Sequence, residues 1–150
     1  MDAGTILKKL ELNSESKKYG ILLASLMFIW SGINKIKNFD KKVSTLMKKT
    51  KVNLHLSRLG MILVILLEIV GFLFLIEYFF NKSILFNLFN KVNNILKVTQ
   101  KQFIQIILLL VLLFLVVVTV IYHPFNLKHP IPFLSNLSIF GLLLYVYSDL

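Results

Sequence analysis

The stretch FIQIILLLVLLFLVVVTVIY, from Phe103 to Tyr122, decides the fold of this chain. It contains no charged residue, and its length matches the ~20 apolar residues that a helix needs to cross a bilayer. The β-branched run Val116–Val118 does not favour a strand, because a lone strand in lipid would leave its backbone N–H and C=O groups unpaired. A second stretch of this kind, RLGMILVILLEIVGFLFLIEYFF, runs from Arg58 to Phe80 with one acidic residue near its middle. Both stretches are predicted to be transmembrane helices.

Two shorter apolar runs complete a set of four predicted spans, at about 19–36, 59–80, 102–122 and 132–148. The first run has a basic flank like that of a secretory signal peptide, but SGINKIK follows it and offers no small-x-small cleavage site. We therefore expect a retained helix, with Trp30 and Lys35 as its anchors at the membrane interface.

The composition of the chain agrees with a membrane protein. Its hydrophobic fraction is 57%, its mean hydropathy is +0.77, and 16% of its residues are charged, whereas soluble domains carry about 25% charged residues. Cysteine is absent, which excludes disulfides and thiol chemistry by this chain. The net charge is +10, and all basic residues but one are lysine. Because arginine is preferred for forked phosphate recognition, this balance favours anionic lipid headgroups as partners and not nucleic acid.

The chain divides into a polar tail, residues 1–18, and a single membrane domain, residues 19–150. Two amphipathic segments connect the spans, at about 40–55 and 82–98. The first is basic and is expected to lie on the headgroups. The second has apolar residues at helical spacing and is expected to contact either lipid or a partner protein. The predicted fold is an all-α, left-handed transmembrane four-helix bundle with amphipathic interfacial helices in its first and second connections.

Four short motifs carry a resemblance to a known family. They are FIWSGINKIKNF (28–39), LLEIVGFLFLI (66–76), TVIYHPF (119–125) and NLSIFGLLL (136–144). In this order they resemble the helix signatures of the DoxX-like family of small four-helix integral membrane proteins. The resemblance implies a four-helix bundle with both termini cytoplasmic. Family members include membrane subunits of sulfur and thiol redox complexes, some linked to quinone, and eukaryotic relatives that resemble chaperones or cargo receptors, so the resemblance fixes a fold better than an activity.

The chain departs from the family pattern at two places. Residues 81–101 form an insertion between the second and third helices, where the family has a short link. Phe72 follows Gly71, where the family commonly doubles the glycine. The insertion suggests added surface contacts and puts the transfer of a redox role in doubt.

Glu68 is the sharpest candidate for chemistry, because it lies near the middle of the second span. Ionisable residues inside membranes are costly and are functional candidates by default. One reading is a proton carrier beside a quinone, and the other is a carboxyl group that hydrogen-bonds a neighbouring helix. Lys35 is expected to face either a headgroup, which is the preferred reading, or Glu68. Glu77 is expected near the interface, where Lys82 is its predicted partner, and no chemistry is assigned to it.

A second set of polar residues lies in the third and fourth spans. Gln105, Thr119 and His123 share one stripe of the third span, and Asn136 is placed to hydrogen-bond across helices. His123 is read either as a proton relay or as a histidine bonded at the membrane boundary. No metal site is predicted, because His129 lies across a turn from His123 without a nearby acid.

Small residues at helical spacing are read as sites of close helix packing. They are Gly20, Ala24, Ser31, Gly32, Gly60, Gly71 and Gly141.

No catalytic residues are assigned, because the chain lacks a Ser-His-Asp set, a phosphate-binding glycine loop and paired carboxylates. Two functions are carried forward. The first is a non-catalytic scaffold, assembly factor or structural component that binds other membrane proteins or further copies of itself, in a complex or a membrane-bounded particle. The second is a membrane subunit of a quinone-linked sulfur or thiol oxidoreductase, with quinone as the one cofactor considered, in a pocket lined by Glu68 and His123. Charge does not orient the chain, because its basic residues divide almost evenly between the two sides.

Overall fold

The computed structural model describes residues 14–82, 84–92, 98–125 and 130–150. These residues fold into helices and short connections, and they contain no strand. The elements in chain order are α2 (Ser14–Lys37), α3 (Phe39–Thr50), α4 (Leu54–Leu66), the π-helical turn η1 (Leu67–Gly71), α5 (Phe72–Phe79), α6 (Ile84–Val92), α7 (Gln100–Tyr122) and α8 (Ile131–Asp149). The predicted all-α class is confirmed.

Four helical stretches are long and apolar enough to cross a membrane. They are Ser16–Lys37, the continuous Leu54–Phe79, Gln100–Tyr122 and Ile131–Asp149. The chain is therefore an integral multi-pass membrane protein. The start of α2 and the end of α8 lie at the same end of the bundle, where Lys17 Nζ is 2.6 Å from Asp149 Oδ2.

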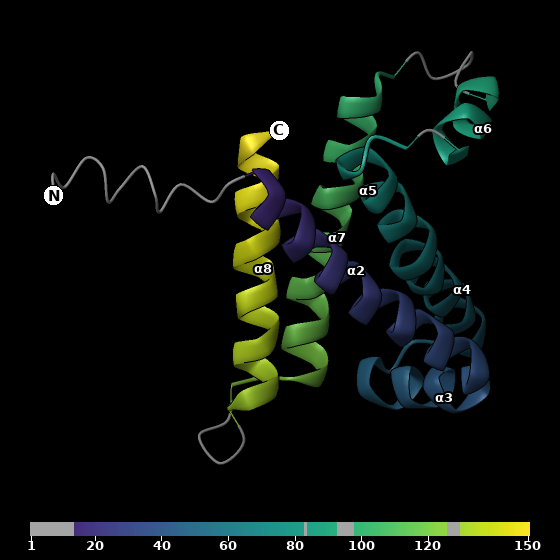
Figure 1. The fold of residues 1–150 in the computed structure, drawn as a ribbon. Coiled ribbons are helices and arrows are strands. Elements are labelled where there is room, and N and C mark those ends of the chain that lie inside the picture. The colour runs from purple at the N-terminus through teal and green to yellow at the C-terminus, as the bar shows by residue number, and fades with distance from the viewer. Residues whose placement is uncertain (1–13, 83, 93–97, 126–129) are drawn as a thin grey trace, which may run out of the picture.

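The spans close into a bundle in which α2 crosses the others at an angle (Figure 1). It packs along α4, η1 and α5, while α7 lies between α5 and α8. α8 packs chiefly on α7 and only lightly on α2, so α8 is the span least covered by its own chain. In the most apolar part of α8, 11% of the residues are buried inside the protein, whereas the corresponding fraction in the other three spans is 28–33%.

Apolar side chains fill the interior between these helices. The rings of Phe28 and Phe72 stack at 4.3 Å and join α2 to α5. The fully buried residues of the core come from α2, α5, α6, α7 and α8, and the largest are Phe72, Phe86, Ile21, Leu75, Ile104, Leu108 and Leu143. These side chains stabilise the association of the helices through close packing, because in lipid no water is released when they are buried.

Polar side chains fix where two of the spans begin. The Asn53 side chain accepts a hydrogen bond from the N–H of Leu56 and caps α4, so the second span starts earlier than the predicted residue 59. Thr99 and Gln102 form a reciprocal capping box that starts α7 at Gln100. Helix α2 likewise begins within the predicted polar tail, at Ser14, and residues 1–13 lie outside the described residues.

The two connecting helices lie at opposite ends of the bundle (Figure 1). α3 begins one residue before the predicted segment 40–55, ends at Thr50 and packs on α4, with Leu46 against Gly60. Its Val43 is 2% exposed. α6 falls within the predicted segment 82–98 and buries Phe86 in the core. Residues 83 and 93–97 of that segment lie outside the described residues. Both connecting helices therefore pack partly on the protein itself.

Candidate functional site

A buried ion pair joins the first span to the second. Lys35 Nζ lies 2.7 Å from both carboxylate oxygens of Glu68 and donates a further hydrogen bond of 2.7 Å to Ser31 Oγ. The Ser31 hydroxyl in turn donates to Glu68 Oε1 at 3.3 Å. The Glu68 side chain is 3% exposed and that of Lys35 is 19% exposed. The three ammonium protons thus meet three acceptors inside the bundle.

The local sequence of each helix builds this pair. Ser31 and Lys35 are one turn apart on α2, so both face the same neighbour. Gly32 lies between them, and a Cβ atom at this position would sit 2.6 Å from Ile69 Cγ1. The glycine therefore allows the backbone of α2 to approach η1 closely.

Glu68 itself lies in a π-helical turn, which the apolar periodicity of the second span did not predict. The turn, Leu67–Gly71, interrupts the α-helical pattern of this span with wider i→i+5 bonds. Such a turn rotates the side chains that follow it about the helix axis, relative to where a regular α-helix would place them. Glu68 and Glu77, nine residues apart in the second span, are both buried in the structure.

The preferred prediction for Lys35, a position at the lipid headgroups where it would anchor the first span, is wrong. The ammonium group of Lys35 turns inward to Glu68. An unpaired carboxylate inside the membrane would be costly, and this contact offsets that cost. Trp30 is 67% exposed, and Lys37 Nζ lies 6.0 Å from the centre of its ring, so the pair of Trp30 and Lys37 occupies the outer surface at this end of the helix.

The remaining predicted polar residues lie apart from the ion pair. Asn136 Nδ2 donates a hydrogen bond of 3.0 Å to Thr119 Oγ1, which links α8 to α7. Thr119 Oγ1 also donates to the carbonyl of Leu115 at 2.6 Å. His123 is exposed at the end of α7, and His129 lies outside the described residues. Within the described parts of the chain, no hydrogen bond or ion pair joins Glu68 to Gln105, Thr119, His123 or Asn136, so the structure does not assemble these residues into one polar site.

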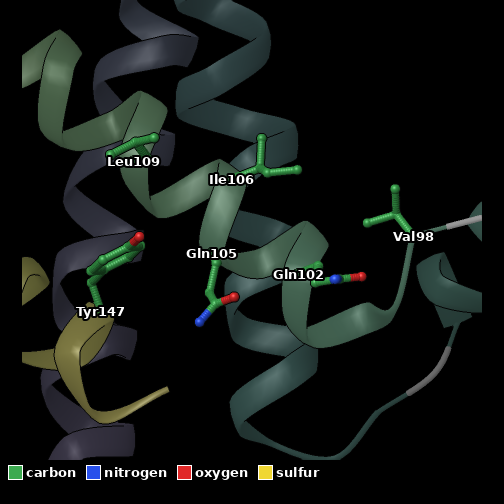
Figure 2. Close-up of a pocket in the computed structure, with 6 residues that line it drawn as sticks. All are labelled: Val98, Gln102, Gln105, Ile106, Leu109 and Tyr147. Carbon is green, nitrogen blue, oxygen red and sulfur yellow. The ribbon is translucent and has the colours of Figure 1, made fainter. Parts of the chain in front are cut away.

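Gln105 lines a separate open pocket between α7 and α8, with a volume of about 470 Å³. Figure 2 shows the Gln105 carboxamide on the α7 side and Tyr147 on the α8 side. Apolar side chains of Val98, Ile106 and Leu109 form the rest of the wall together with Gln102. Three of the six lining residues, Gln102, Gln105 and Tyr147, carry polar side-chain groups, and the pocket is open to its surroundings.

Glu77 has a structural role that sequence reasoning missed. Its carboxylate accepts hydrogen bonds from the backbone N–H groups of Leu85, at 2.6 Å, and Phe86, at 3.0 Å. These groups lie in the first turn of α6, where a negative charge is favoured by the helix dipole. The predicted pairing of Glu77 with Lys82 is wrong, because both oxygens of the Glu77 carboxylate accept hydrogen bonds from the N-terminal turn of α6. The sequence signal was an acid separated by a short turn from an amphipathic helix.

The predicted packing residues differ in how closely other helices approach them. Ala24 and Gly71 are buried, Gly71 beside Ile107 of α7. Gly20 lies beside Leu142 of α8, and Gly60 faces Leu46 of α3. A Cβ atom at Gly141 would meet nothing within 4 Å. Gly141 is therefore not a packing site within the single chain.

Comparison with protein-family models, with curated proteins and with solved structures gave no significant match.

Proposed function

We propose that the chain is a DoxX-like membrane protein that acts as a non-catalytic scaffold, assembly factor or structural component, in a membrane complex or a membrane-bounded particle. The observation that carries this proposal is the closed ion pair of Lys35 and Glu68. A proton carrier needs a group that is free to exchange its proton with a substrate or with water. Both oxygens of Glu68 are instead engaged by Lys35, and the carboxylate is nearly inaccessible. The pair acts as a clamp between two spans.

The assembly part of the proposal rests on α8. This span exposes large apolar side chains along most of its length, among them Leu134, Leu137 and Leu144. Gly141 lies on the same helix with open space around it. A neighbouring helix from another membrane protein, or from a second copy, can approach a glycine closely.

The proposal is tested by native mass spectrometry, with an absorbance spectrum, on protein extracted gently from its own membrane. We expect a homo-oligomer or a complex with other proteins, without a bound chromophore. Gly141→Leu should break the assembly and leave the monomer folded, because the added side chain meets open space in the single chain. Leu63→Phe, on the exposed face of α4, is the matched control and should leave the assembly intact. A monomeric wild type that reduces a quinone or thiol on its own would overturn the proposal.

A second candidate is a quinone-linked redox subunit, and one observation favours it. The pocket between α7 and α8 presents the Gln105 amide and the Tyr147 hydroxyl, which are hydrogen-bond donors suited to quinone carbonyls. In this candidate the quinone lies at Gln105 and Tyr147, and not between Glu68 and His123. A quinone that co-purifies with the wild type and is lost in Gln105→Leu, while Ser138→Leu, an exposed position of α8 outside the pocket, retains it, would favour the second candidate over the first.

A further inference from the structure

Helix α3 is held firmly across one end of the bundle. Its apolar side is covered by the protein: Val43 is buried, and Leu46 lies against Gly60 of α4. Short connections tie it to α2 and α4, because α3 begins two residues after Lys37 and α4 begins at Leu54. Figure 1 shows α3 running across the bundle axis near the ends of the spans.

A third span also contacts α3. Lys49 Nζ donates a hydrogen bond of 3.3 Å to the carbonyl of Ile121 and lies 4.4 Å from the centre of the Tyr122 ring. Ile121 and Tyr122 are the last residues of α7. α3 is therefore fixed at the level where three spans end, which is the level of the lipid headgroups.

The outward side of this end of the bundle is strongly basic. Its exposed cations are Lys37, Lys41, Lys48, Lys49, Lys51 and Arg58. Among the described residues, two carboxylates lie near them, and both have partners. Glu68 is bound by Lys35, and Asp40 lies 3.6 Å from Arg58. The positive charge of the exposed lysines is thus not balanced by carboxylates of the described chain.

Two of these lysines point the same way. Lys41 and Lys48 are seven residues apart, which is two helical turns, so they lie on one line along α3. That line is opposite the buried Val43. Both ammonium groups therefore face away from the protein, toward whatever lies around this end of the bundle.

We infer that the outward face of α3 binds the phosphate headgroups of anionic phospholipids in the surrounding leaflet. The face has the charge that such headgroups attract, and the depth of α3 places it beside them. Lysine suits this role, because a flexible point charge follows a fluid headgroup, whereas a fixed phosphate is better held by an arginine fork. This inference concerns a different surface from α8 and does not rest on the proposed scaffold function.

The test uses the full chain in a neutral detergent, with phosphatidylglycerol or phosphatidylcholine added, and counts retained lipids by native mass spectrometry. We expect the wild type to prefer phosphatidylglycerol, with a preference that falls as salt is raised. The double variant K41Q/K48Q should bind phosphatidylglycerol about 30-fold more weakly, because two headgroup contacts are lost. K41R/K48R keeps both charges and should retain binding.

The matched control is K82Q/K101Q, which removes two exposed lysines away from α3: Lys82 follows α5, and Lys101 lies in the first turn of α7, whereas α3 contacts the last turn of α7. It should bind phosphatidylglycerol like the wild type, and circular dichroism should show full helicity for all variants. Equal loss in the two double variants, or equal retention of the two lipids by the wild type, would overturn the inference. Glycerol phosphate, added in excess without lipid tails, should not displace the bound lipid; full displacement would mean a site for soluble phosphate instead.

Discussion

The ion pair between Lys35 and Glu68 makes a quantitative and asymmetric prediction. Removing one partner of a buried pair typically costs about 3–5 kcal/mol, because the remaining charge is left uncompensated. The two partners differ in where they can go. The Glu68 side chain is 3% exposed, and its one other hydrogen-bond partner among the described residues is the Ser31 hydroxyl, whereas Lys35 is 19% exposed and lies two residues before the end of α2.

We therefore expect Lys35→Met to lower the free energy of unfolding by about 3 kcal/mol, at the low end of that range. Glu68→Gln should cost about 1–2 kcal/mol, because the freed lysine can extend to the headgroups. The double variant should cost about 1–2 kcal/mol as well, since no charge is then left unpaired. The coupling energy between the two positions is then about 3 kcal/mol.

The measurement is reversible unfolding in mixed micelles, followed by circular dichroism, for the four members of this cycle. Lys37→Met is the matched control, because Lys37 is exposed and its contact with Trp30 is on the outer surface; its cost should stay below about 0.5 kcal/mol. The reasoning is refuted if Lys35→Met costs no more than Lys37→Met. It is also refuted if the double variant costs the sum of the two single variants.

Three further predictions follow from other contacts. Gly32→Ala should destabilise the bundle by about 1–3 kcal/mol, because the methyl group would overlap Ile69. Gly141→Ala should stabilise the single chain by up to about 1 kcal/mol, because alanine favours the helix and its methyl group meets open space; the unfolding midpoints of the two variants compare them. Glu77→Gln should weaken the cap of α6, and hydrogen exchange should speed up at the amides of its first turn while α7 stays protected. Because the chain contains no cysteine, Ser44→Cys and Ser148→Cys each give a single labelling site; three spans separate them, so an impermeant thiol reagent should reach them from opposite sides. Labelling of both from one side of sealed vesicles would contradict the four-span arrangement.

The fold was predictable because the membrane leaves few alternatives. A charge-free stretch as long as Phe103–Tyr122 has to be a helix in lipid, since only a helix pairs all of its own backbone groups. The starts of the spans were less predictable. They depend on the caps at Asn53 and Thr99, which are polar residues outside the apolar runs.

The members of the ion-pair cluster were predicted more clearly than the contacts between them. Ser31 was predicted as a packing residue, and the contact of Lys35 with Glu68 was the second reading, after a position at the headgroups. Helical periodicity gives the face of each residue on its own helix, but it does not say which helix that face meets. The π-helical turn at Leu67–Gly71 makes this harder, because it changes the face of the residues that precede and follow it.

The same limit explains why Glu68 and His123 were grouped and the structure separates them. The redox hypothesis placed both residues in the lining of one quinone pocket. In the structure the two residues have different surroundings. Glu68 is paired with a lysine from the adjacent span, and His123 is exposed where α7 ends. An intramembrane acid whose cost is already offset by a neighbouring cation needs no ligand to explain it. Polar groups of the described residues also line two pockets away from the ion pair, Gln105 and Tyr147 in one, and Thr119 and Asn136 in the other.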